Sequence, residues 1–170
     1  MHLSDVIHDM DKTLMLTNSP GWDEDEVRDH RNLNFEKGYL WEATLKAGFG
    51  EMMAIRPDEV VVDGIAMNPD GVRHDWPDTA VLLEEYKCTA CSPRPPSDNW
   101  KWMMQVKGYC KALGALKCIF RIFYPGAVMT HPESAYGVFL LTFTQGELDE
   151  NWEAVLNHAK VMRGRDDVHN

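Results

Sequence analysis

Charged residues continue the apolar faces of two strand-like runs, and this pattern constrains the fold more than any other feature of the chain. In the run 59–66, the period-two alternation of a strand places Asp63 on the apolar face. In the run 81–88, Glu85 and Lys87 likewise continue the apolar face. Charged groups that point toward a core are costly unless they are paired or bind an ion. The two runs therefore predict a polar site at the edge of the core.

A turn-forming segment at 68–71 follows the first run, so the two strands are expected to be neighbours in one sheet, with Asp63 near Glu85. An isolated Glu-x-Lys triplet is more often an exposed ion pair on an edge strand. Glu84 also offers a carboxylate, and the choice of Glu85 rests on its spacing to Lys87. The case for a functional site therefore depends on what the rest of the chain adds.

Two helical stretches add further polar side chains. Between residues 35 and 49, apolar residues recur every three or four positions, and Glu42 lies on their side of the helix. In the stretch 101–113, Gln105 and Tyr109 are four residues apart and share a face. Taken alone, each is an ordinary residue at the margin of a core. Together with the strands they supply carboxylates and a lysine, the groups that hold a divalent metal ion against a phosphodiester.

In chain order the candidate residues form one series: Glu42 on a helix, Asp63 on a strand, Glu85 and Lys87 on the next strand, and Gln105 and Tyr109 on a helix. This series resembles the PD-(D/E)xK nuclease superfamily, and most of all its RecB-type branch, which includes the lambda-type exonucleases. The resemblance covers roughly residues 35–124. Val62 stands where the superfamily's name has proline, a position where substitution is common.

The resemblance implies an α/β fold with a restriction-endonuclease-like core, in which helices flank a mixed central β-sheet. The other elements expected around this core are a helix, two strands and a last helix, near 3–16, 116–124, 136–144 and 151–162. One nuclease domain is expected over residues 1–170, because a chain of this length can bury one good core. Its parts are an acidic N-terminal segment, the core and a frayed tail, at 1–34, 35–162 and 163–170.

The resemblance also implies one or two Mg²⁺ or Mn²⁺ ions, which are hard cations that favour oxygen ligands. Asp63, Glu85 and Glu42 would coordinate the metal, with the backbone carbonyl of Tyr86 as a further ligand. Metal binding lowers the pKa of a bound water and neutralises the charge that builds on the phosphate oxygens.

Lys87 would orient the attacking water or stabilise the negative transition state. Gln105 and Tyr109 would position the lysine, the water or the DNA phosphate. The implied activity is metal-dependent hydrolysis of DNA by an exonuclease, in recombination, repair or phage genome processing. Two alternatives stay open: a structure-directed endonuclease such as a junction resolvase, and a catalytically inactive member that binds DNA or protein.

The net charge of −10 is unusual for a nucleic-acid-binding protein, because such proteins usually have a basic surface. The charge is uneven: the segments 1–30 and 125–170 carry −6 and −4, whereas 31–124 is neutral. The predicted DNA contacts are basic and aromatic residues that follow the Glu-x-Lys strand, namely Arg94, Lys101 and Trp102. The acidic ends would limit non-specific binding or contact a basic protein partner.

Four cysteines, Cys88, Cys91, Cys110 and Cys118, all lie within the predicted core. Some members of the RecB-type branch carry an iron–sulfur cluster, held by one cysteine before the core and three after it. The spacing here fits neither that pattern nor a zinc ribbon, so no cluster is expected. Buried or boundary thiols in a reducing cytoplasm are expected instead.

The chain has no apolar run of the length of a transmembrane helix, and its acidic N-terminal region lacks the pattern of a signal peptide. A cytoplasmic protein without membrane partners is therefore expected, in the host cytoplasm if a phage encodes it. A homo-oligomer stays open.

Overall fold

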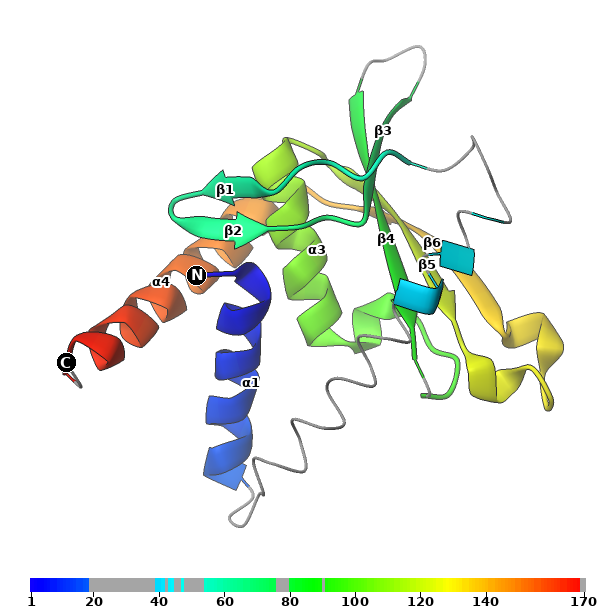
Figure 1. The fold of residues 1–170 in the computed structure, drawn as a ribbon, viewed down its shortest axis with the longest axis horizontal. Helices are drawn as coiled ribbons and strands as arrows, with labels where there is room; N and C mark the ends of the chain where they lie inside the picture. The colour runs from blue at the N-terminus through cyan, green and yellow to red at the C-terminus, as the bar shows by residue number, and fades with distance from the viewer. Residues whose placement is uncertain are drawn as a thin grey trace.

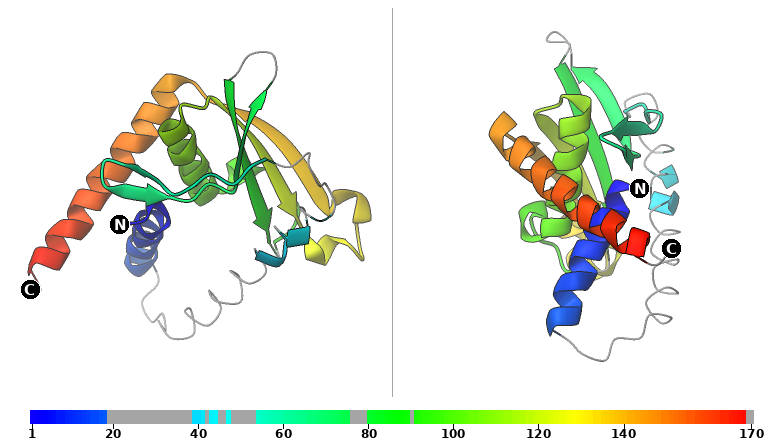
Figure 2. Two further views of the ribbon diagram at one scale, coloured as in Figure 1. Left: turned by 45° about the horizontal axis from the view of Figure 1, so that its top comes forward. Right: turned by 90° about the vertical axis from the view of Figure 1, so that its left-hand side faces the viewer.

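A four-stranded mixed sheet forms the centre of the protein, and helices pack against one of its faces (Figures 1 and 2). The computed structural model describes residues 1–18, 39–41, 43, 44, 47, 54–75, 80–89 and 91–168. The strands of the sheet are β3 (Gly71–Asp75), β4 (Ala80–Cys88), β5 (Lys117–Phe123) and β6 (Tyr136–Thr142). The main helices are α1 (Leu3–Asn18), α3 (Trp100–Leu113) and α4 (Gln145–Val168). Short 3-10 turns occur at Pro96–Asp98, Pro125–Ala127 and Pro132–Ser134.

The strands of this sheet follow the order β3-β4-β5-β6. β4 runs parallel to β5, with Glu85 opposite Phe120, whereas β3 and β6 are antiparallel to their neighbours. Parallel neighbours need a crossover connection, and α3 provides it. The predicted α/β class, with a mixed central sheet flanked by helices, is confirmed.

Alternation along β5 separates the two faces of the sheet. Cys118, Phe120 and Ile122 are fully buried, and the residues between them are half-buried. The ring of Phe120 contacts Trp102 of α3, with the ring centroids 5.7 Å apart. Figure 2 shows α1, α3 and α4 on the same side of the sheet. The hydrophobic core therefore lies between this face and the three helices.

The last helix begins earlier than expected, at Gln145 rather than near 151. The N–H of Thr144 donates to Oε2 of Glu147 at 2.7 Å, and the N–H of Glu147 donates back to Oγ1 of Thr144 at 3.3 Å. This reciprocal pair is a capping box, which satisfies backbone donors that a helix start leaves without partners. α4 then continues to Val168, into the segment expected to be frayed.

The run 59–66 is not one strand beside β4, which corrects the sequence prediction. It forms a hairpin of β1 (Val60–Val62) and β2 (Ile65–Met67) in a separate two-stranded sheet. Asp63 and Gly64 make the turn, with φ angles of 53° and 74°. Asp-Gly is a preferred pair for tight hairpin turns, because both residues tolerate positive φ. The strand that pairs with β4 is β3, which begins directly after Asp70.

The hairpin is held from two sides. On the side of α4, the indole N–H of Trp152 donates to Oδ2 of Asp63 at 2.8 Å. On the other side, the backbone N–H of Ala66 donates to the carbonyl of Met1 at 2.9 Å. Because only two residues separate β2 from Asp70, these contacts fix the path by which the chain enters β3.

Two further sequence expectations concern membranes and thiols. No helix in the described part of the chain is long and apolar enough to cross a membrane. Cys110 and Cys118 are buried and Cys88 is half-buried, but Cys91 is exposed, so the expectation of buried or boundary thiols is wrong for Cys91.

Gly71 is packed too closely for a larger side chain. A Cβ at this position would lie 2.6 Å from Cβ of Ala54 and 3.4 Å from the hydroxyl of Tyr86. Gly71→Ala is therefore expected to lower the free energy of unfolding by about 1–3 kcal/mol, as measured by denaturant titration. The matched control is Gly146→Ala in α4, where nothing lies within 4 Å of the new atom, and it is expected to be neutral or slightly stabilising. Equal stability of the two variants would contradict this packing.

Candidate active site

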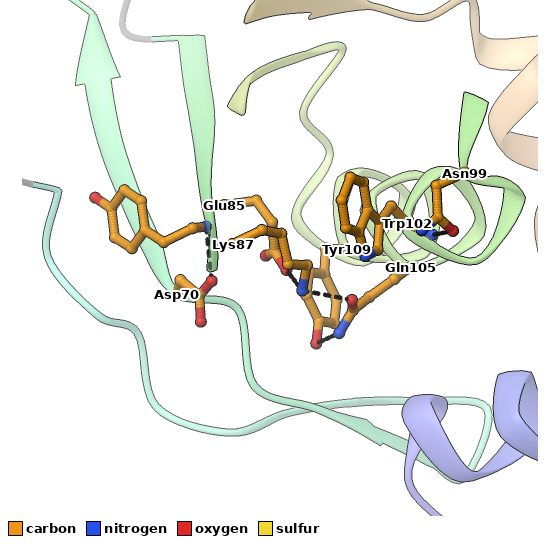
Figure 3. Close-up of polar contacts among 8 residues, drawn as sticks. Asp70, Glu85, Lys87, Asn99, Trp102, Gln105 and Tyr109 are labelled. Carbon is orange, nitrogen blue, oxygen red and sulfur yellow. Dashed lines mark hydrogen bonds and ion pairs between the residues drawn. The ribbon is translucent and has the colours of Figure 1, made fainter. Parts of the chain in front are cut away.

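Four of the predicted residues meet between β4 and α3 (Figure 3). Nζ of Lys87 lies 2.5 Å from Oε1 of Glu85, on the same strand. Lys87 also donates to Oε1 of Gln105 at 2.9 Å, and Nε2 of Gln105 donates to the hydroxyl of Tyr109 at 2.8 Å. The Glu-x-Lys strand and the Gln-x-x-x-Tyr helix face are thus joined by one chain of hydrogen bonds.

A second carboxylate, Asp70, lies beside this chain of hydrogen bonds. It directly precedes β3, and its Oδ2 accepts the backbone N–H of Tyr86 at 2.8 Å. Because Tyr86 stands between Glu85 and Lys87, this bond brings Asp70 to the same stretch of β4 (Figure 3). Asp70 is not among the site residues predicted from the sequence. The signal that identifies it is the pair Pro69-Asp70, which matches the proline and aspartate in the superfamily's name.

Asp63 does not join the cluster, so the prediction that it lies beside Glu85 is wrong. It occupies the turn of the β1–β2 hairpin, where its carboxylate accepts the indole N–H of Trp152. The apolar alternation does not continue through this point, because the Asp-Gly turn reverses the chain. The contacts of Asp63 are those of a residue that docks the hairpin on α4.

The pKa values of Glu85, Lys87 and Tyr109 are raised above their ordinary values. Glu85 is 1% exposed, and its pKa is raised to about 8, first by burial and then by the negative charge of Asp70. Burial alone would lower the pKa of Lys87, but the carboxylates of Glu85 and Asp70 raise it above its ordinary value. Burial and the charge of Glu85 also raise the pKa of Tyr109. At neutral pH the site therefore holds a charged lysine and a protonated phenol.

The acidic pair also fits a divalent metal ion. Oε2 of Glu85 is buried, and no N–H or O–H group of the described residues donates to it. Two carboxylates with an oxygen left over are the ligand chemistry that Mg²⁺ and Mn²⁺ prefer. Among the described residues, no three or more His, Cys, Asp or Glu side chains lie together as a metal-binding cluster, so the described part of the site contributes two acidic ligands. Glu42, the third acidic ligand of the sequence prediction, lies outside the described residues, and the ligand role of the Tyr86 carbonyl stays a prediction.

The neighbouring carboxylate, Glu84, belongs to the other face of the sheet. Successive residues of a strand point to opposite faces, and Glu84 contacts Arg73 and Arg121 rather than Lys87. The contact with Lys87 is made by Glu85, the carboxylate that the spacing of the motif favours.

The three predicted DNA contacts have different surroundings. Arg94 has an exposed side chain, and its backbone is held by Tyr124, whose hydroxyl donates to the Arg94 carbonyl at 2.7 Å. Lys101 forms an ion pair with Asp11 of α1 at 2.8 Å. Trp102 packs against the core through Phe120. Arg94 is therefore the most accessible of the three, and DNA contact by each of them stays a prediction.

No protein-family model and no curated protein sequence matches the chain. Among solved structures, it is similar to an alkaline exonuclease from Laribacter hongkongensis, with a TM-score of 0.52 and 14% identity, over 99% of this chain and 94% of that one. The complex of the same exonuclease with dAMP gives a TM-score of 0.51 and 15% identity, with the same coverage of both chains.

The chain has the fold of this nuclease. The exonuclease belongs to the PD-(D/E)xK superfamily, which the residue series in this sequence resembles. The α/β fold with a mixed central sheet that the resemblance implies is therefore confirmed for the described residues. At 14% identity this likeness shows the fold alone and not the chemistry of the site.

The raised pKa of Glu85 predicts that the metal-free protein loses stability as the pH rises. Folded Glu85 keeps its proton up to about pH 8, whereas the ordinary value is 4.5. The folded state therefore binds the extra proton between these pH values, and the free energy of unfolding falls across this window. Glu85→Gln removes the titration, so in EDTA at pH 8 it is expected to be more stable than the wild type by about 1–3 kcal/mol.

The measurement is denaturant unfolding of both proteins in EDTA at pH 5 and pH 8. Little difference is expected at pH 5, because Glu85 is then protonated in the folded state. If the two proteins differ in free energy of unfolding by the same amount at both pH values, the raised pKa of Glu85 is not the source of the difference.

Proposed function

We propose that this protein is a divalent-metal-dependent nuclease that hydrolyses DNA from its ends. The observation that carries the proposal is the buried oxygen of Glu85 that receives no hydrogen bond from the described residues, with Asp70 beside it and a charged lysine within contact. A buried carboxylate oxygen that receives no hydrogen bond costs about 1–3 kcal/mol, and Glu85 has a second acid beside it where Glu84 has two arginines. A bound cation removes that cost.

Asp70 and Glu85 would hold Mg²⁺ or Mn²⁺, with the Tyr86 carbonyl and Glu42 as further ligands. When bound, the metal supplies a water of lowered pKa and positive charge next to the phosphate. The protein's own part is to hold both acids side by side and to exclude water from behind them. Burial of Glu85 serves the second purpose. Because burial and Asp70 raise the pKa of Glu85, this residue would release its proton when the cation binds.

Lys87 would act as a fixed positive charge. Its raised pKa keeps the ammonium protonated at neutral pH, which suits stabilisation of a negative transition state and does not suit removal of a proton from water. Glu85 accepts one of the three N–H groups of the Lys87 ammonium, and Gln105 accepts another. The third N–H group of Lys87 therefore points in a defined direction. Tyr109 fixes the amide of Gln105 in this orientation by accepting its N–H.

Action from DNA ends is supported by the fold shared with an alkaline exonuclease that also forms a complex with dAMP. A role in recombination, repair or phage genome processing, a homo-oligomer and a basic protein partner are further proposals from the superfamily resemblance. Each of them presupposes that the site cleaves DNA.

The direct test is incubation of the purified protein with linear and closed-circular DNA, single- and double-stranded, in Mg²⁺, Mn²⁺ or EDTA. Loss of linear DNA only, dependent on metal and abolished in Lys87→Ala, is the expected result. Cutting of closed circles would show an endonuclease instead. Absence of cleavage in either metal would contradict a nuclease and leave a protein that binds DNA or another protein.

Replacing each aspartate by asparagine tests whether Asp70 or Asp63 is the metal ligand. Asp70→Asn is expected to lower kcat by about 100-fold or more, because it removes a charged ligand. Asp63→Asn is expected to keep activity within about threefold, since its amide oxygen can still accept the Trp152 indole N–H and asparagine tolerates the positive φ of 53°. Cleavage kinetics under saturating Mg²⁺ measure both. Loss of activity in Asp63→Asn with retention in Asp70→Asn would reverse the assignment.

A further inference from the structure

A second polar cluster lies on the face of β4 that points away from the candidate active site. Its centre is Glu84, which is 0% exposed. Oε2 of Glu84 accepts the hydroxyl of Tyr86 at 2.8 Å and Nε of Arg121 at 3.1 Å, and Oε1 lies 3.3 Å from Nε of Arg73. Arg121 in turn donates to the hydroxyl of Tyr136 at 3.0 Å. These five residues are called the Glu84 network below.

The Glu84 network connects all four strands of the central sheet. Arg73 belongs to β3, Glu84 and Tyr86 to β4, Arg121 to β5 and Tyr136 to β6. A buried carboxylate with two arginines is weak evidence for added stability, because apolar residues of similar size can pack as well without the desolvation cost. What such a network supplies is a fixed arrangement of strands, since the charges can be satisfied in one register and not in the neighbouring ones.

Tyr86 links this network to the acidic pair. Its side chain is bonded to Glu84, while its backbone N–H donates to Asp70 at 2.8 Å. Its hydroxyl also lies close to Gly71, where a Cβ would be 3.4 Å away. The residue that follows Asp70 and the carboxylate of Asp70 itself are therefore both in contact with Tyr86. A shift of the Tyr86 main chain would therefore move the N–H group that Asp70 accepts.

We propose that Glu84 and Tyr86 are positioning residues, which set the spacing of Asp70 and Glu85 from the opposite face of the sheet. Neither side chain touches the metal or the DNA. Glu84 anchors the Tyr86 hydroxyl, and the main chain of Tyr86 then presents its N–H to Asp70 and its carbonyl to the metal. The inference rests on the proposed function, because it assigns a task to a site that holds a metal.

The test compares Tyr86→Phe with Tyr136→Phe. Each variant removes one phenolic hydroxyl from the Glu84 network and keeps the ring, and neither breaks the contacts of Glu84 with Arg73 and Arg121. Similar losses of thermal stability are therefore expected. Only Tyr86 also contacts Asp70, so Tyr86→Phe is expected to weaken Mn²⁺ binding by about 10-fold, and Tyr136→Phe by less than about twofold.

Calorimetric titration of each metal-free protein with Mn²⁺ gives the dissociation constants, and cleavage kinetics give kcat and KM. Tyr86→Phe is expected to lower kcat and leave the KM for DNA unchanged, because the DNA-facing side chains keep their places. Amide hydrogen exchange in EDTA supplies a readout that needs no metal: the N–H of residue 86 is expected to exchange faster in Tyr86→Phe alone.

The outcomes separate the two claims. If wild type and both variants bind Mn²⁺ equally well and the exchange of the amide at residue 86 is unchanged, the positioning role is overturned while the nuclease assignment stands. If the wild type neither binds Mn²⁺ nor cleaves DNA, the proposed function fails, and this role with it. Should Tyr86→Phe fail to fold, Glu84→Gln takes its place, and Mn²⁺ affinity equal to that of the wild type would overturn the inference.

Discussion

The acidic side chains of Asp70 and Glu85 lie together at a buried edge of the sheet, where water would screen the repulsion of two negative charges poorly, and the pKa of Glu85 is raised as a result. The described neighbours of Glu85 balance its negative charge only in part. Lys87 contacts one oxygen of Glu85, and the backbone N–H of Tyr86 donates to one oxygen of Asp70. The second oxygen of Glu85 receives no donor from the described residues. This incomplete balance is the reason why a cation is expected here, and the rest of the site follows from it.

The surrounding elements hold the pair from three directions. The β1–β2 hairpin, docked on α4 through Trp152 and on the N-terminal residues through Ala66, delivers the chain to Asp70. On the helix side, α3 holds Lys87 through Gln105. From behind the sheet, Glu84 fixes Tyr86. Glu85 and the residues that hold Lys87 therefore lie on regular elements, whereas Asp70 lies in the short connection that the β1–β2 hairpin and Tyr86 hold in place.

The sequence predicted the residues of regular elements well. Glu85 and Lys87 on a strand, and Gln105 and Tyr109 one helical turn apart, have fixed spacings that translate directly into a shared face. Asp70 was harder to predict because it lies in the loop between β2 and β3, where no periodicity operates. Asp63 was misplaced for the opposite reason, since an apparently continuous alternation hides an Asp-Gly turn. Long-range contacts such as Trp152 with Asp63 leave no local signal, as they join residues far apart in the chain.

Asp70 and Glu85, and not Asp63, are the residues proposed to hold the metal. The most direct measurement is a crystal structure of the protein with Mn²⁺, in which anomalous scattering locates the ion without reference to the protein atoms. A peak is expected between the carboxylates of Asp70 and Glu85, within coordination distance of the Tyr86 carbonyl. A peak at the hairpin turn beside Asp63, or an empty acidic pair at saturating Mn²⁺, would contradict this assignment.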